Sequence, residues 1–468
     1  MNFSGNKQLP FFLLFIAVFI TRLPFLHAGY GVEEDSWGIA LAAFHTKITG
    51  IYEPSRFPGH PVQELIYSAL WGYGPMVFNG LSAFFSAIAT VFFARILQQL
   101  NFKFYFLAAL AFAFVPVFYI SSTYTIDFVW SEALVLISLY YVLKNKLILT
   151  GIFLGLAVGC RITNGVMLLP FMIILWQQGN LKQNCLNILK MAVPMGVVAL
   201  LAFLPVILQF GTSFFMYYDQ FPYPPITKVI YKITLGVFGF VGLLAIVLTL
   251  IVIVLKRKEQ HPGQLFETAL NKKIITAAFL IIVLYLISYF RLPQKSGYLI
   301  PVIPFVILLF GYYANARNFQ LLCYSLIVSS FFCSINLTDK LRGATYSGMA
   351  KTFTISGQEV FFDVLTGPVI SDYSKRIQKI NYTTGLINAA SQITTKKVII
   401  AGWWYNEIMV TMIPLKPNEN VVYAAYIDEN KMKEYKASGY GIVYLPEQNI
   451  YNDQMFKMKV TDTLAQPF

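Results

Sequence analysis

Long apolar runs alternate with short polar segments over the first 337 residues of the chain. Most of these runs reach the roughly 18 residues that mark a candidate membrane-crossing helix. The predicted spans are Leu9–Leu26, Met76–Leu97, Phe104–Ile120, Tyr124–Leu143, Leu147–Cys160, Gly165–Trp176, Ile188–Phe210, Tyr231–Leu255, Ile274–Phe290, Tyr298–Ala314 and Gln320–Leu337. The fifth and sixth are short and are interpreted as a tight pair. The pattern predicts an α-helical polytopic membrane protein with about eleven transmembrane helices.

Basic residues gather in alternate loops between these runs. Lys144 and Lys146 form one such loop, and the segment 256–273 is another. Short basic loops stay on the cytoplasmic side of a membrane. Starting from a cytoplasmic Lys7, the alternation puts the long loop 27–75 and the C-terminus outside. We therefore expect a multi-pass protein of the cytoplasmic (inner) membrane, with its N-terminus in the cytoplasm.

The composition becomes polar and mixed after residue 337, and no later run is long enough to cross a membrane. Strands are expected at 396–404, 420–427 and 440–445, and helices around 387–393 and over 430–438. This alternation predicts a small α/β domain with a mostly parallel sheet. The expected organisation is a transmembrane catalytic domain, 1–337, followed by an extracytoplasmic domain, 338–468.

Composition supports lipid as the main solvent for this chain. Of its 468 residues, 57% are hydrophobic and only 12% are charged, whereas a soluble domain carries about 25% charged residues. The net charge of +13 does not indicate a nucleic-acid partner, because the basic residues lie in the loops between spans. The four cysteines do not have the spacing of metal ligands.

The first external loop contains three consecutive carboxylates, Glu33, Glu34 and Asp35. Acids at a membrane surface suit a general base that deprotonates a hydroxyl, or ligands for a divalent cation. A solvated acidic turn is the structural alternative. Further along the loop, Arg56 is a planar donor suited to phosphate oxygens, with a structural ion pair as its alternative. His60 is a candidate for acceptor binding or a structural histidine.

Charged residues also occur where the membrane makes charge costly. They are Asp127 and Glu132 in one apolar segment, Arg161 between two short segments, and Arg291 and Lys295 with Tyr298 in an external turn. Ionisable residues at membrane depth are functional candidates. We expect Asp127 and Glu132 to face the protein interior, as functional groups or as a hydrogen-bonded pair that joins helices. Lys295 is a phosphate ligand or an interfacial anchor.

The order of these motifs resembles that of the GT-C superfamily of polyprenyl-phosphate-sugar-dependent glycosyltransferases. This group includes protein mannosyltransferases and the aminoarabinose transferases of lipid A. The resemblance covers residues 1–337 and rests on the first span, the acidic loop, the Arg-Pro-Gly turn, Ser131-Glu132, Gly155–Arg161 and Arg291–Pro304. It implies that Asp35, or else Glu34, is the catalytic base.

The resemblance further implies that basic residues of the later external loops bind the carrier phosphate. The donor-binding candidates are Arg291, Lys295, Arg56, Tyr298 and Arg161, and the candidates for acceptor binding or structure are Glu33, His60, Asp127 and Glu132. No cofactor is implied with certainty, and Glu34 and Asp35 are candidate ligands if a divalent cation takes part.

The expected function is inverting transfer of a sugar from a polyprenyl-phosphate carrier to a hydroxyl of a glycan, lipid or protein acceptor on the outer membrane face. Two other classes stay open. A lipid-linked-sugar flippase would need internal repeats with interrupted helices, and no repeat is evident in the sequence. A membrane scaffold would not need the loop acids.

Overall fold

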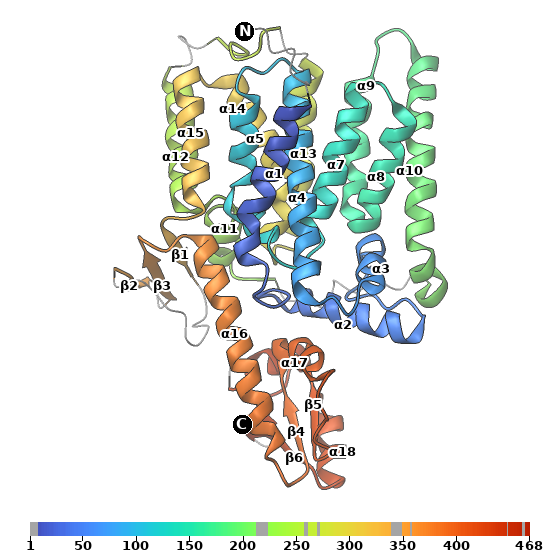
Figure 1. Cartoon of the computed structure of the whole chain (residues 1–468), viewed down its shortest axis with the longest axis vertical. Helices are drawn as coiled ribbons and strands as arrows, with labels where there is room; N and C mark the ends of the chain where they lie inside the picture. Colours follow the sequence, from blue (N-terminus) through green and yellow to red (C-terminus); the bar gives the residue numbers. More distant parts are fainter. Residues whose placement is uncertain are drawn as a thin grey trace.

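The computed structural model describes residues 8–211, 223–256, 261–268, 272–337, 349–355, 358–446, 448–460 and 464–468. Lys7, parts of the loops 211–227 and 256–273, and the predicted boundary at residue 338 lie outside the described residues. The structure consists of a bundle of helices joined to a smaller unit built around a sheet (Figure 1).

Helices make up the first part of the chain. They are α1 (Leu9–Arg22), α2 (Glu34–Thr49), α3 (Pro61–Ala69), α4 (Gly74–Gln99), α5 (Tyr105–Ala113), α6 (Pro116–Ser121), α7 (Phe128–Leu143), α8 (Leu147–Cys160) and α9 (Leu168–Leu175). The bundle continues with α10 (Leu181–Phe210), α11 (Ile226–Ile233), α12 (Leu235–Leu255), α13 (Lys272–Arg291), α14 (Ile303–Tyr313) and α15 (Ala316–Ser329). Short 3-10 segments are η1 (Leu23–Phe25), η2 (Ile162–Met167) and η4 (Ser296–Val302).

Five helical segments among the described residues are long and apolar enough to cross a membrane: Gly74–Gln99, Leu181–Phe210, Leu235–Leu255, Lys272–Arg291 and Ser296–Tyr313. Shorter apolar helices occupy Leu9–Phe25, Phe128–Leu143, Leu147–Cys160 and Ile162–Leu175. The predicted span 104–120 is divided into two helices, because Pro116 at the start of α6 lacks the N–H that a continuous helix needs. The count of about eleven crossings therefore stays a prediction.

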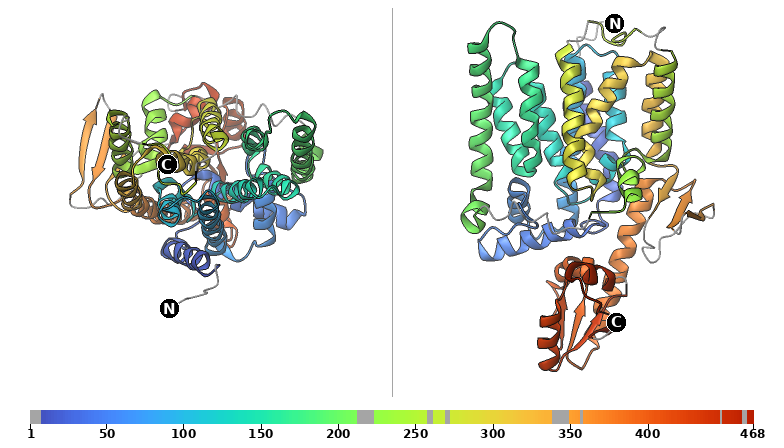
Figure 2. Two further views of the ribbon diagram at one scale, coloured as in Figure 1. Left: turned by 90° about the horizontal axis from the view of Figure 1, so that it is seen from above. Right: turned by 180° about the vertical axis from the view of Figure 1, so that it is seen from behind.

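The first long loop and the C-terminal unit lie at one end of the bundle, and the start of α1 lies at the other (Figures 1 and 2). Helix α2 runs across the end that carries the C-terminal unit, and α3 packs on α2 (Figure 1). This arrangement agrees with the predicted alternation of spans, in which loop 27–75 and the C-terminus share one side. The compartment that each end faces stays a prediction.

Glycines set the close packing of α8 on α10. A Cβ atom at Gly155 would lie 2.7 Å from the carbonyl oxygen of Met195 and 2.7 Å from the Cβ of Val198. At Gly151, one turn earlier, it would lie 2.2 Å from the Met191 carbonyl oxygen. Small residues at this spacing allow two backbones to approach closely where lipid provides no hydrophobic driving force. The packing brings the end of α8, and with it Arg161, to the loop before α3.

The C-terminal unit contains a four-stranded parallel sheet of order β5-β4-β6-β7. The strands are β4 (Lys397–Ile400), β5 (Val421–Ala424), β6 (Gly441–Tyr444) and β7 (Gln466–Pro467). The helices are α16 (Pro368–Ser391), α17 (Tyr405–Met412), α18 (Glu429–Ala437) and α19 (Asn449–Phe456), with η5 (Gly402–Trp404). The first three strands and α18 lie where the sequence predicts a parallel α/β arrangement.

Side chains of β4 alternate between two apolar cores. Ile399 packs with Leu386 of α16 and Ile408 of α17 on one face of the sheet. Val398 packs with Met432 of α18 on the other face. This alternation is the period-2 pattern of a strand buried on both faces. The helix predicted around 387–393 proves to be only the end of α16, which extends back to Pro368 and reaches the bundle.

A second, antiparallel sheet of order β1-β3-β2 is not predicted by the sequence. Its strands are β1 (Ser334–Asn336), β2 (Lys351–Ile355) and β3 (Gln358–Asp363). The predicted span 320–337 is wrong at its C-terminal end, because α15 ends at Ser329 and β1 follows. The Ser330 hydroxyl donates a 2.5 Å hydrogen bond to the Phe114 carbonyl, and Cys333 adopts a positive φ of 58°, so the chain turns away from the helix axis there.

Candidate active site

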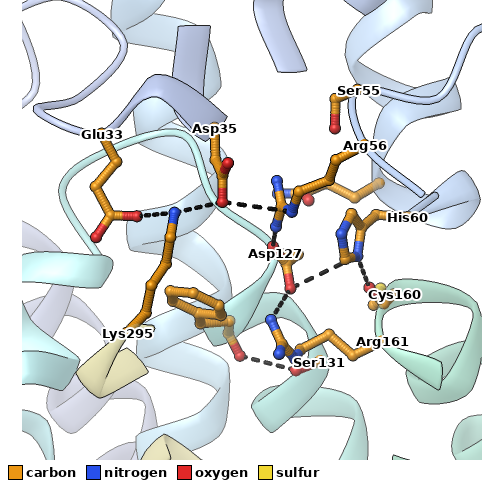
Figure 3. A network of polar contacts seen from close by, with 12 residues as sticks. Glu33, Asp35, Ser55, Arg56, His60, Asp127, Ser131, Cys160, Arg161 and Lys295 are labelled. Carbon is orange, nitrogen blue, oxygen red and sulfur yellow. Dashed lines mark hydrogen bonds and ion pairs between the residues drawn. The ribbon is translucent and has the colours of Figure 1, made fainter. Parts of the chain in front are cut away.

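Charged side chains from five separate segments converge at the end of the bundle that carries α2 and α3 (Figure 3). They come from the start of α2, the loop before α3, the start of α7, and the turns that follow α8 and α13. All of these are helix ends and loops, where unpaired backbone groups and irregular geometry allow polar side chains to be directed inward. The members of this acid–cation cluster are Glu33, Asp35, Arg56, His60, Asp127, Arg161 and Lys295.

Asp127, the residue before α7, is the centre of the cluster. Its side chain is 0% exposed, and each of its oxygens receives an arginine. Arg56 Nη2 lies 2.5 Å from Oδ1, and Arg161 Nη1 lies 2.6 Å from Oδ2. As expected, the Asp127 side chain faces the protein interior, where it joins separate segments through ion pairs. Its partners are two arginines, and it does not pair with Glu132.

Asp35 forms the second centre, next to Asp127. Its Oδ2 contacts Lys295 Nζ and lies 3.4 Å from Arg56 Nε, whereas no contact joins its Oδ1 to any described residue. Lys295 Nζ also lies 2.5 Å from Glu33 Oε2. Burial by itself would raise the pKa of Asp35, but Arg56 and Lys295 lower it to about 2. The Asp35 carboxylate is therefore ionised at neutral pH, with one oxygen held by cations and the other available.

Glu34 behaves differently from its neighbour. It forms no ion pair with any cation among the described residues, and burial, followed by the charge of Asp35, raises its pKa to about 7. Lys295 and Lys379 oppose that shift. Two adjacent carboxyl groups therefore have pKa values on opposite sides of the usual range, which is a common feature of functional sites.

Lys295 is held in its charged form. Burial would lower its pKa, but Asp35 and Glu33 raise it well above the ordinary lysine value. The Lys295 side chain is 19% exposed, so it reaches the surface of the cluster. A cation that is paired with carboxylates yet partly accessible is suited to exchange its partner for an incoming anion.

His60 and Glu64 fix the loop that carries Arg56. His60 Nδ1 donates to the Cys160 carbonyl at 2.5 Å, which ties the loop to the end of α8. The 2% exposed carboxylate of Glu64 accepts hydrogen bonds from the Ser55 amide at 3.0 Å and the His60 amide at 2.8 Å, and from the Tyr52 hydroxyl. Burial lowers the pKa of His60, so a neutral, structural imidazole is favoured. Sequence reasoning missed Glu64, although an acid in the first turn of a helix is a recognisable capping signal.

Two aromatic rings cover Arg161. Its guanidinium carbon lies 4.8 Å from the ring centroids of both Phe128 and Tyr298. Gly297 makes room for this arrangement, because a Cβ atom there would lie 2.2 Å from the Phe128 ring. A desolvated cation–π contact of this kind orients the guanidinium. Tyr298, predicted as a donor ligand, therefore lies beside the cluster and contacts Arg161.

Besides Glu34 and Tyr298, two predicted site residues lie outside the cluster. Arg291, the last residue of α13, is exposed and forms no ion pair with any described residue. Glu132 is 0% exposed in α7, as expected for an interior residue, but its oxygens have no hydrogen-bond partner within the described part of the chain. Arg291 is close to Lys295 in sequence, but the turn between them directs only Lys295 inward.

The described residues do not form a protein-only site for a divalent cation. Among the described residues, no group of three or more His, Cys, Asp or Glu side chains could hold a metal ion. In addition, Glu33 and Asp35 already contact Lys295, so a metal ion at the acidic turn would face a lysine cation.

These features define a polytopic helical membrane protein with a partly accessible acid–cation cluster at one end of its bundle. No protein-family model and no curated protein matches the chain. Its structure is similar to the crystal structure of ArnT from Cupriavidus metallidurans in the apo state, with a TM-score of 0.54, 11% sequence identity and coverage of 95% of both chains. The chain therefore has an ArnT-like fold over most of its length.

Replacing Asp127 by Asn should destabilise the protein strongly. The change removes the charge that compensates Arg56 and Arg161, and breaking one side of a buried ion pair costs about 3–5 kcal/mol. Thermal unfolding of the detergent-purified protein measures the effect. Glu53→Gln, which alters the exposed pair between Glu53 and His45, is the control and should change stability little. Equal melting temperatures for the two variants would contradict a central role for Asp127.

Proposed function

We propose that the protein is a membrane glycosyltransferase that transfers a sugar from a polyprenyl-phosphate carrier to a hydroxyl acceptor, with inversion at the anomeric carbon. The observation that carries the proposal is the arrangement at Asp35, whose Oδ2 is held by Lys295 and Arg56 while Oδ1 remains available. One side chain thus presents a proton acceptor next to cations suited to phosphate. The ArnT-like fold supports the same class, because ArnT is a GT-C aminoarabinose transferase.

In the proposed reaction, Asp35 Oδ1 accepts the proton of the acceptor hydroxyl. The hydroxyl oxygen forms a bond to the anomeric carbon as the bond from that carbon to the phosphate oxygen breaks. Polyprenyl phosphate leaves with the electron pair, and Lys295 and Arg56 stabilise its charge. Cations that are already oriented before the charge develops stabilise a transition state without the cost of reorganisation.

Donor binding and base strength are linked in this mechanism. In the unliganded protein, Lys295 and Arg56 hold the pKa of Asp35 at about 2, and a carboxylate of such low pKa is a weak base. When the donor phosphate binds the two cations, their interaction with Asp35 weakens. The pKa of Asp35 then rises, and the carboxylate becomes a stronger base. The base would then become effective only when a donor is present.

Asp35→Asn should abolish transfer while leaving the fold intact. The amide retains the size of the side chain but cannot accept the proton, and a general base contributes about 10²–10⁴-fold. Glu34→Gln should retain activity, because Glu34 is not held by the cations that bind the phosphate. The assay is transfer from polyprenyl-phosphate mannose or aminoarabinose to a hydroxyl acceptor by purified variants. Full activity in Asp35→Asn would contradict the mechanism and favour a flippase or scaffold.

Lys295→Ala should raise the KM for the donor and lower kcat, because Lys295 contacts both acids and would contact the leaving phosphate. A charge-assisted hydrogen bond contributes about 1.5–3 kcal/mol, which corresponds to roughly a 10- to 150-fold loss in kcat/KM. Arg291→Ala is the matched control, since Arg291 belongs to the same turn but lies outside the cluster. A larger loss in Arg291→Ala than in Lys295→Ala would restore Arg291 as the phosphate ligand.

Donor affinity should rise as the pH falls through about 7. The pKa of Glu34 is about 7, so this carboxyl is ionised above that pH and repels the donor phosphate. Below it, protonation removes the repulsion, whereas Asp35 stays ionised because its pKa is about 2. The KM for the donor should therefore decrease between pH 8 and pH 6 in the wild type. Glu34→Gln should have a low KM at both pH values, and an unchanged pH dependence in this variant would exclude Glu34 as the titrating group.

A further inference from the structure

One face of α16 lies along the segment that connects the first helix of the bundle to the acidic turn. The Tyr373 hydroxyl lies 2.5 Å from His27 Nε2, and Ile380 packs on Gly29, where a Cβ atom would lie 2.9 Å from the Ile380 Cδ1 atom. The residues of α16 that make these contacts, together with Arg376 and Lys379, are three or four positions apart and so share one helix face. Helix α16 of the C-terminal unit thus contacts the segment 25–32, which leads from the first helix to the acidic turn.

Arg376 binds this segment at its beginning. The guanidinium is 1% exposed and donates to the Phe25 carbonyl at 3.1 Å and to the Thr123 carbonyl at 2.9 Å. Its Nε also lies 3.0 Å from Asp372, one turn earlier in α16. Because Thr123 lies just before Asp127, Arg376 joins the start of the acidic loop to the start of α7.

Lys379 binds the same segment at its end. Its ammonium donates to the Val32 carbonyl at 2.9 Å, and Val32 immediately precedes Glu33. Glu407 of α17 lies 3.0 Å from the same ammonium, and the two side chains are only 4% and 1% exposed. Burying a lysine and a glutamate together costs desolvation that a simple apolar contact avoids. A buried lysine is nevertheless required if its ammonium must donate to a backbone carbonyl inside the protein, as Lys379 does to Val32.

We infer that Lys379 is a positioning residue for the proposed transfer: held by Glu407, it fixes the acidic turn through the Val32 carbonyl and sets the charge environment of Glu34. The inference rests on the proposed function, and it gives the C-terminal unit a direct part in the reaction. Without this contact the turn that carries Asp35 is less constrained. Misplacing a catalytic group by about 1 Å can cost on the order of 10²-fold in rate.

The groups that act on Glu34 come from three packed elements. They are Asp35 in its own helix, Lys295 in the turn before η4, and Lys379 on α16. Asp35 raises the pKa of Glu34, whereas the two lysines lower it. Removing Lys379 should therefore raise that pKa and move the pH dependence of the donor KM to higher pH.

The test uses the full-length protein in detergent and the double variant Lys379→Met/Glu407→Leu. Replacing both charges leaves no unpaired buried ion, and such replacements are often neutral for stability. The matched control is Lys433→Met/Glu429→Leu, which makes the same chemical change in the exposed pair of α18, where the ions are 2.8 Å apart and 62% and 54% exposed. The Lys379 variant should lose about 10- to 100-fold in kcat with a melting temperature near that of the control.

Two readouts separate positioning from a general structural role. A lower kcat together with a shift of the KM midpoint to higher pH supports the inference. A kcat equal to that of the control, or a lower kcat with an unmoved midpoint, overturns it. If the wild-type protein transfers no sugar, the proposed function fails. In that case, amide hydrogen exchange over residues 27–36 tests whether Lys379 fixes the acidic turn. Faster exchange in the Lys379 variant than in the control supports this role, and equal exchange overturns it.

Discussion

The organisation of the site depends on one buried charge, the carboxylate of Asp127. A completely buried carboxylate is stable only when it is paired and hydrogen-bonded, because desolvation of an ion costs several kcal/mol. Here Arg56 comes from the loop before α3 and Arg161 from the end of α8, so compensating the charge requires three distant segments to meet. Any arrangement that separated these segments would leave an unpaired ion in the protein interior. The fold and the site are therefore specified by the same interaction.

The second centre of the cluster follows from the first. Arg56 contacts Asp127 through Nη2 and approaches Asp35 through Nε, so the position of Asp127 determines how Asp35 is held. Lys295 then balances the remaining negative charge of Asp35 and Glu33. Arg56 and Lys295 are thus each paired with a carboxylate. In the proposed reaction, the donor phosphate takes the place of that carboxylate as the partner of each cation.

Much of this organisation can be read from the sequence, because charge is conspicuous in an apolar chain. Asp127, Arg161 and Lys295 stand out as charges at membrane depth, and Asp35 and Arg56 as polar residues of the first long loop, and all five lie in the cluster. The sequence does not show which of these charges form ion pairs, because that depends on which loops the packing of the helices brings together. Arg291 and Lys295 are equally plausible candidates in the sequence, and only the backbone of their turn directs Lys295 into the cluster and leaves Arg291 exposed. Contacts to backbone carbonyls leave still less signal in a single sequence.

The C-terminal unit illustrates this last limit. Its parallel strands follow from apolar runs, whereas Arg376 and Lys379 lie in a polar stretch where surface lysines and arginines are ordinary. Their function depends on α16 extending back to the bundle, and the apolar pattern around 387–393 identifies only the end of that helix. Both residues bind main-chain oxygens, and a carbonyl is available whatever residue carries it. Contacts of this kind tolerate wide sequence change in the loop, so the identity of the loop residues carries no signal of them.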